Sequence, residues 1–160
     1  MEGRMAFDSK LAKEVIERRS ATPGVALPIL HDLQHTFGYI ADEAIALMAE
    51  ALNISRAEAL GVVSFYPDFR RRPVDGRVMK LCRAESCQSM GCEDLVAHLE
   101  RAHGIVVDEA TPGAGLHVET VYCLGHCALS PTALVDGEPV GRLDPDRLDA
   151  IVAGDDVRPQ

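Results

Sequence analysis

Residues 82–91 read CRAESCQSMG and residues 123–131 read CLGHCALSP, so the chain contains one Cys-x4-Cys pair and one Cys-x3-Cys pair. A short apolar run at residues 78–81 precedes the first pair, and an alternating segment at 117–122 precedes the second. Each cysteine pair therefore follows a predicted strand, where the backbone leaves the sheet and can turn around a bound group.

Two thiolate pairs that converge from two loops suit a 2Fe–2S cluster, which needs two thiolates for each iron. Such a cluster is anionic, so backbone N–H donors must stabilise it. Small residues near the pairs allow the backbone to turn its N–H groups inward; these are Ser86, Ser89, Gly91 and Gly125. The candidate ligands of the cluster and its irons are Cys82, Cys87, Cys123 and Cys127.

Other uses of these cysteines remain open at this point. Structural zinc prefers two-residue knuckles and a thioredoxin-type disulfide needs Cys-x-x-Cys, and neither spacing occurs here. Buried structural thiols would not be expected to form two pairs beside loops. The fifth cysteine, Cys92, begins the following predicted helix, and we interpret it as a small buried apolar residue.

The segment before the cysteines, residues 1–66, predicts four short helices. Asp8 is a candidate N-cap for the first, Thr22-Pro23 for the second, and Asp42 begins the third. Residues 55–58 read SRAE, a capping box that predicts the start of the fourth helix. We expect a small bundle at residues 1–70 that attaches the chain to a partner.

Two prolines, a glycine and three consecutive arginines lie within residues 66–77, which we interpret as a linker. After it the pattern predicts a strand, a helix at 91–103, a second strand, a hairpin around Asp136-Gly137 and a final helix after Asp144-Pro145. This order is typical of a thioredoxin-like α/β layer. The predicted fold class is therefore α/β, with a helical bundle followed by a thioredoxin-like domain at residues 71–160.

The composition excludes several classes of protein. A net charge of −9 and a pI near 5.0 argue against binding to nucleic acid or to an anionic membrane. No apolar run approaches the roughly 18 residues of a membrane span, and the N-terminal residues mix both charge signs, unlike a secretory signal. Cytosolic cysteines in groups are more often metal ligands or catalytic thiols than disulfides. We expect a cytoplasmic protein.

The two cysteine spacings, the helical segment before them and residues 61–69, GVVSFYPDF, resemble the thioredoxin-like 2Fe–2S subunit that partners the flavoprotein of respiratory complex I. The resemblance covers roughly residues 8–153 and implies that the four matching cysteines ligate the cluster, with Cys92 outside the ligand set. His126 lies between two ligands, where we expect a smaller residue in relatives. We expect it to make the redox potential depend on pH.

The amino-acid sequences of the two cysteine loops resemble most the gamma subunit of soluble NAD-dependent formate dehydrogenases. This implies an electron-transfer subunit, without catalytic residues of its own, beside an FMN- and NAD-binding flavoprotein and a large molybdenum or tungsten subunit. The equivalent subunit of an NAD-linked hydrogenase or of complex I is the alternative reading. A free-standing thioredoxin-like ferredoxin and a structural zinc module are further alternatives.

Overall fold

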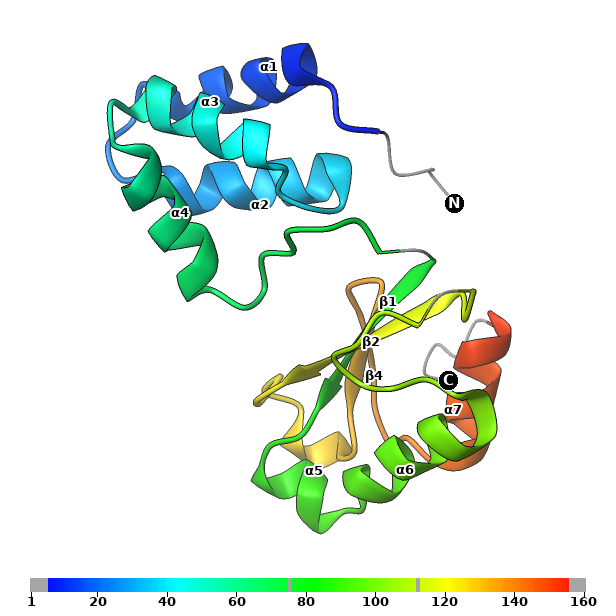
Figure 1. The fold of residues 1–160 in the computed structure, drawn as a ribbon. Helices are drawn as coiled ribbons and strands as arrows, with labels where there is room; N and C mark the ends of the chain where they lie inside the picture. The colour runs from blue at the N-terminus through cyan, green and yellow to red at the C-terminus, as the bar shows by residue number, and fades with distance from the viewer. Residues whose placement is uncertain (1–5, 75, 112, 156–160) are drawn as a thin grey trace. The chain divides into compact units, whose positions relative to one another are not determined.

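The computed structural model describes residues 6–74, 76–111 and 113–155. The chain divides into two compact units, and the boundary between them falls between Pro73 and Val74. The described residues of the first unit form helices and turns, and those of the second unit form a mixed α/β domain (Figure 1). The α/β fold class predicted from the sequence is confirmed.

Residues 6–73, the described part of the first unit, form four helices whose ends carry most of the caps expected from the sequence. The Asp8 carboxylate accepts hydrogen bonds from the backbone N–H groups of Lys10 and Leu11. Ser55 and Glu58 form a complete capping box at the start of the fourth helix. The four helices are α1 (Ser9–Ser20), α2 (Ala26–Phe37), α3 (Asp42–Leu52) and α4 (Arg56–Phe65).

The predicted start of α2 is wrong. The sequence places it at Thr22-Pro23, but the helix begins at Ala26 after an N-cap residue, Val25, that makes no side-chain capping bond. Gly24 has a φ of +76°, a left-handed conformation that cannot continue into a right-handed helix. Thr22 and Pro23 therefore belong to the turn that separates α1 from α2.

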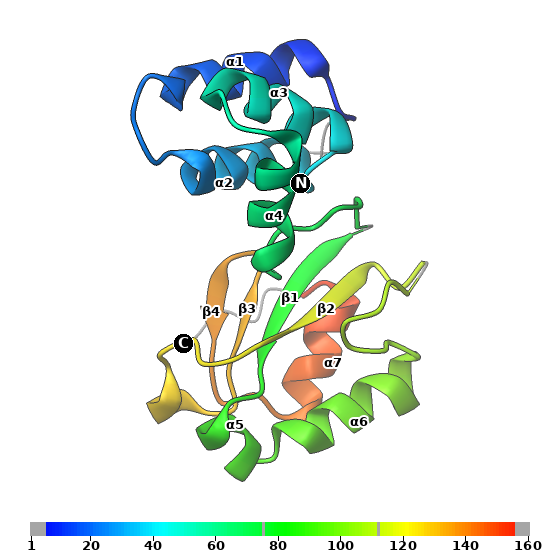
Figure 2. The same cartoon turned by 60° about the vertical axis from the view of Figure 1, so that its left-hand side comes forward.

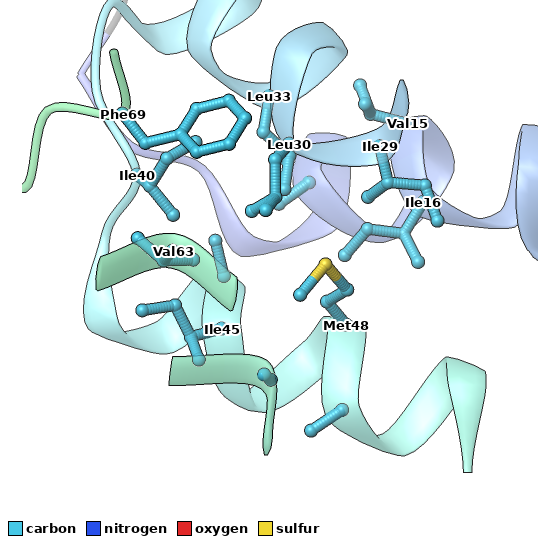
Figure 3. Close-up of a cluster of buried hydrophobic side chains, with 14 of the residues drawn as sticks. Val15, Ile16, Ile29, Leu30, Leu33, Ile40, Ile45, Met48, Val63 and Phe69 are labelled. Carbon is cyan, nitrogen blue, oxygen red and sulfur yellow. The ribbon is translucent and has the colours of Figure 1, made fainter. Parts of the chain in front are cut away.

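The core of this unit is mainly aliphatic, with Phe37 and Phe69 added, and it joins all four helices (Figure 3). Ile29, Leu30 and Leu33 of α2 are fully buried and lie close to Ile16 of α1 and Met48 of α3. Burying an aliphatic side chain of this size contributes about 1.5–3 kcal/mol. The shared core accounts for the stability of four helices that are individually too short to persist in water.

The second unit is built on a four-stranded mixed sheet with the strand order β2-β1-β3-β4 (Figure 2). β1 pairs in parallel with β2 and antiparallel with β3, and β3 pairs antiparallel with β4. The strands are β1 (Arg77–Cys82), β2 (Leu116–Val121), β3 (Ala133–Val135) and β4 (Glu138–Val140). The helices are α5 (Glu85–Ser89), α6 (Cys92–His103) and α7 (Pro145–Ala153), with a 3-10 turn, η1 (Cys127–Leu129).

Helices α6 and α7 cover the same face of the sheet (Figures 1 and 2). Leu95 and Leu99 of α6 and Leu148 of α7 belong to one buried cluster with Met79 and Leu81 of β1. The Asp144 carboxylate accepts a hydrogen bond from the backbone N–H of Arg147, and Pro145 is the first residue of α7, as the sequence predicts. β1 is thus a central strand that ends at Cys82, and its side chains are packed against the apolar residues of α6 and α7.

Both edge strands of the sheet have distinctive features. In the hairpin, Asp136 and Gly137 have φ values of +52° and +92°, the positive values that a two-residue type I′ turn requires. Pro139 lies opposite Leu134 in edge strand β4. At the other edge, Asp108 contacts β2, because its N–H donates to the Val118 carbonyl at 2.8 Å.

Every helix in the part of the chain that the structure describes is too short or too polar to cross a lipid bilayer.

Candidate functional site

The first cysteine pair lies where β1 ends. Cys82 is the last residue of the strand, and its backbone N–H donates to the carbonyl of Thr132 in the segment before β3. Cys87 lies in the middle of α5, a short helix where the sequence predicts a flexible loop. Both side chains are buried. Gly91, with a φ of +89°, lets the chain turn from α5 into α6.

The second pair lies on an irregular loop after β2. Cys123 has a φ of +68°, uncommon for a residue with a side chain, and Gly125 follows with +79°. These two left-handed residues turn the loop so that Cys127 begins η1. The side chains of Cys123 and Cys127 are both exposed. The site therefore has a buried half, formed by Cys82 and Cys87, and a solvent-facing half.

Hydroxyl groups and a close backbone contact hold the second loop in place. The Ser130 Oγ donates to the Cys127 carbonyl at 2.9 Å and lies 2.9 Å from the Ser86 Oγ of α5. The backbone N–H of Arg142 donates to the Leu129 carbonyl at 2.6 Å. A Cβ at Gly141 would lie 2.5 Å from the Leu129 Cβ, so only glycine fits there without displacement. The two cysteine segments are thus joined to each other and to the hairpin.

Backbone N–H groups from both cysteine segments act on Cys82. Burial, the largest influence, raises the pKa of the Cys82 thiol, but hydrogen bonds to its sulfur outweigh burial and lower the pKa overall. The backbone donors are Ala84 in the first segment and Leu124 and Cys123 in the second, and the Cys87 thiol also contributes. Donors that stabilise an anionic sulfur are what a thiolate-bound cluster requires.

Interactions among the thiols show that all four converge. The pKa of the Cys127 thiol is raised first by its hydrogen bond with Cys123 and by the charge of the Cys123 thiolate. Burial contributes next, followed by the charges of Cys87 and Cys82. Four thiolates this close repel one another, and a cationic metal centre removes that repulsion. The donor set and its N–H groups therefore fit a four-thiolate iron–sulfur cluster.

Cys92 has a different environment. Its side chain is fully buried beside Cys82 and Cys87, and its sulfur lies 3.8 Å from the Glu93 carboxylate. Burial, followed by the negative charge of Glu93, raises the pKa of the Cys92 thiol to about 11. A thiol in such surroundings stays protonated at neutral pH, whereas a metal ligand must be a thiolate. These surroundings suit the packing role expected for Cys92.

His126 lies in the second loop, immediately before Cys127, and its side chain is half-buried. Its carbonyl accepts a hydrogen bond from the backbone N–H of Leu129 at 2.9 Å, which closes η1. The effect of this histidine on the redox potential stays a prediction.

Two hydroxyl groups beside Cys87 are not anticipated by the sequence analysis. The Cys87 Sγ lies 3.5 Å from the Ser130 Oγ and 3.9 Å from the Thr132 Oγ1, and both residues are buried. Ser130 and Thr132 flank Pro131, after the second cysteine pair, so sequence spacing does not connect them with Cys87. The antiparallel pairing of β1 with β3 brings the start of β3 beside the end of β1, and thus beside the segment that carries Cys87.

The α/β layer carries one cysteine pair after the central strand β1 and the other after the edge strand β2, and this arrangement fits a small protein that holds a thiolate-bound metal centre. Over residues 12–155 the chain matches the thioredoxin-like 2Fe–2S ferredoxin family. The chain belongs to this family, and its cofactor is a 2Fe–2S cluster. The resemblance and the thioredoxin-like fold predicted from the sequence are confirmed.

Relatives in this family are components of respiratory and hydrogen-metabolising enzymes. The chain is 33% identical to an NADH-quinone oxidoreductase subunit of Rhizobium meliloti, over 85% of this chain and 79% of the relative. It is 28% identical to the NADP-reducing hydrogenase subunit HndA of Solidesulfovibrio fructosivorans, over 89% and 85%. It is 33% identical to NADH-quinone oxidoreductase subunit 2 of Thermus thermophilus, over 80% and 71%.

Among solved structures, the chain is similar to an NAD+-reducing NiFe-hydrogenase in its air-oxidised state. The TM-score is 0.71 and the sequence identity is 28%, over 86% of this chain. The match covers only 23% of the hydrogenase chain, so this protein corresponds to one part of a much longer polypeptide there.

Proposed function

We propose that Cys82, Cys87, Cys123 and Cys127 ligate the 2Fe–2S cluster, and that the chain is an electron-transfer subunit of an NAD(P)-linked oxidoreductase. The observation that supports this most strongly is the convergence of four thiols from two segments, with backbone N–H groups directed at Cys82. A 2Fe–2S cluster accepts and releases one electron at a time. The residues of the chain bind this cluster, stabilise its charge and hold half of it near solvent.

The partner we infer is an FMN- and NAD-binding flavoprotein, which would exchange hydride with the nicotinamide and electrons with the cluster. The relatives named above support an enzyme complex of the NADH-quinone oxidoreductase or NAD(P)-reducing hydrogenase kind as the one in which the chain acts. These relatives support a complex of that kind better than they support the formate dehydrogenase that the sequences of the cysteine loops suggest. A formate dehydrogenase with a molybdenum or tungsten subunit stays a narrower prediction.

Exposed apolar residues beside the cysteines support docking through the cluster domain. Met90, Tyr122 and Leu129 are all exposed, and we name them the apolar rim. Tyr122 precedes Cys123, Leu129 follows Cys127, and Met90 closes α5. Both views place α5 and η1 at the same end of the sheet (Figures 1 and 2). Large exposed apolar side chains around a redox centre suit a protein–protein contact that excludes water.

The ligand assignment is tested by serine substitution in the full chain. The wild-type protein should contain two irons and two acid-labile sulfides, with one unpaired-spin signal after reduction. Serine at any of the four proposed ligands should remove or strongly weaken the cluster. Cys92→Ser is the matched control and should retain it. A zinc-only preparation, or an unchanged cluster in Cys123→Ser, would contradict the assignment.

The setting is tested by what co-purifies with the chain from its native host. A flavoprotein together with a nickel–iron hydrogenase or with quinone oxidoreductase subunits would support the proposal. A flavoprotein with a molybdenum or tungsten subunit and formate-dependent NAD reduction would support the narrower prediction. Recovery of the chain alone, with full redox activity as a diffusing carrier, would favour a free-standing ferredoxin.

The two units can be tested separately as attachment sites. If residues 1–70 attach the chain to its partner, a fragment beginning near Arg77 should assemble a cluster but bind the flavoprotein poorly. If the apolar rim carries the contact, Tyr122→Ser in the full chain should weaken binding, whereas Phe65→Ser, a change at an exposed aromatic of α4, should not. The opposite pattern would assign the contact to the bundle.

A further inference from the structure

Two histidines and an aspartate meet where α6 contacts α7, at a position that the cysteine chemistry does not involve. His98 and His103 belong to α6, and Asp149 belongs to α7. The Nε2 of His98 lies 2.6 Å from the Asp149 Oδ1, and the Nε2 of His103 lies 2.7 Å from the same oxygen. All three candidate donor atoms lie within 4.8 Å of one another.

Both rings direct the same nitrogen, Nε2, at one oxygen of Asp149. Their centroids are 5.8 Å apart and their planes are inclined at 73°, so the rings do not stack but point the same nitrogen toward a common point. Both histidine side chains are largely buried, with 22% and 23% exposed, which limits their alternative rotamers. Asp149 is 46% exposed and can adjust its position.

We propose that His98, His103 and Asp149 form a binding site for a divalent transition-metal ion of the Zn²⁺ type. Imidazole nitrogen and carboxylate oxygen are preferred ligands of such ions, and two histidines with one carboxylate make a three-ligand site with a position left for water. Two neutral imidazoles and one carboxylate leave a Zn²⁺ complex with a single positive charge. The site is separate from the four cysteines.

Binding of the ion requires a local adjustment of the three ligand atoms. Tetrahedral Zn²⁺ with bonds of about 2.0–2.1 Å separates its ligand atoms by roughly 3.3 Å. The two N–O distances must therefore lengthen by about 0.6 Å from the hydrogen-bonded arrangement. Rotation of the half-exposed Asp149 side chain can lengthen both N–O distances. The two Nε2 atoms, which lie within 4.8 Å of each other, must reach the same separation of roughly 3.3 Å. A bound ion would cross-link α6 to α7 and thereby stabilise the second unit.

The test uses the full chain with its cluster intact, because free cysteines would also bind zinc. Isothermal titration with ZnCl₂ under anaerobic conditions should show one saturable site, with an unchanged visible spectrum confirming that the cluster is retained. His98→Asn, His103→Asn and Asp149→Asn should each weaken Zn²⁺ binding at least about 10-fold, because even the loss of a group that only supports a ligand costs that much. Zinc should raise the Tm of the wild type and not of the His98→Asn/His103→Asn double variant.

The control is His35→Asn. His31 and His35 are exposed and spaced four residues apart on α2, so they are another place where two histidines could chelate zinc. This variant should bind Zn²⁺ as the wild type does. Absence of saturable binding, unchanged binding in the double variant, or loss of binding in His35→Asn would each overturn the proposal. The cluster spectrum of each variant shows that the second unit has folded.

Discussion

The hydroxyl group of Thr132 offers a sharp test of how the chain tunes its cluster. Thr132 is 1% exposed, and its Oγ1 has the Cys87 Sγ as a hydrogen-bond partner at 3.9 Å. If Cys87 is a thiolate ligand, its sulfur can only accept, so the hydroxyl must donate. The substitution Thr132→Val removes the donor and keeps the branched shape. Ser130 is less suitable, because its hydroxyl also donates to the Cys127 carbonyl.

The expected effect can be worked out from the charge of the cluster. A hydrogen bond to a charged group contributes about 1.5–3 kcal/mol. Reduction changes the cluster charge from about −2 to about −3, so the bond becomes stronger by up to half of that contribution. At a separation of 3.9 Å we take the lower end, about 0.7 kcal/mol. For one electron this equals about 30 mV, by which Thr132→Val should lower the midpoint potential.

The assay is an anaerobic redox titration followed by visible absorbance and by the spin signal of the reduced cluster. Thr36→Val makes the same chemical change in α2, where the Thr36 hydroxyl donates to the Asp32 carbonyl at 2.8 Å, and should leave the potential unchanged. Thr132→Ser retains a hydroxyl and should stay close to the wild type. Equal potentials in the wild type and an intact Thr132→Val protein, or a higher potential in the variant, would refute the reasoning.

Three further outcomes are expected. Gly141→Ala places a Cβ 2.5 Å from the Leu129 Cβ, and overpacking of about 1–3 kcal/mol should displace the second cysteine loop and speed cluster loss, measured as bleaching. Ser55→Ala removes the capping box of α4 and should lower the free energy of unfolding by about 1 kcal/mol in urea, whereas Ser64→Ala near the end of α4 should change it less. Hydrogen bonds first from His103 and then from His98 lower the pKa of the Asp149 carboxyl. The stability that Asp149 contributes is therefore present above its unfolded pKa and is lost as pH falls through its folded pKa, so acid unfolding of metal-free Asp149→Asn should depend less on pH in this range.

The sequence predicts those elements whose ends carry local chemistry. Asp8, the Ser55–Glu58 capping box and Asp144-Pro145 mark helix starts that the structure reproduces, because a cap acts within three residues of itself. The Asp136-Gly137 turn is equally clear, since few other pairs accept two positive φ values. These signals do not depend on the rest of the fold.

Elements that depend on tertiary contacts escape prediction from the sequence. The helix α5 has five residues, ESCQS, without apolar periodicity, and Ser86 contacts Ser130 far along the chain. Thr22-Pro23 has the composition of a helix start, yet Gly24 separates it from α2. The approach of Thr132 to Cys87 follows from strand order, and that of Asp149 to two histidines follows from helix packing. Residue spacing encodes neither of these.

The two edges of the sheet restrict how the chain can associate with other proteins. In a two-residue hairpin the closing pair, Val135 and Glu138, exchanges the hydrogen bonds, so the nitrogen of Pro139 faces away from β3 and offers no donor to an added strand. At the opposite edge, Asp108 covers part of the free edge of β2. Its carboxylate accepts hydrogen bonds from the Thr120 N–H and hydroxyl, each at 2.6 Å. A strand added to β2 would have to displace Asp108, and a strand added to β4 would lack the hydrogen-bond donor at Pro139. The two edges therefore disfavour strand-to-strand association between copies of the chain, and they direct a partner toward other surfaces of the second unit.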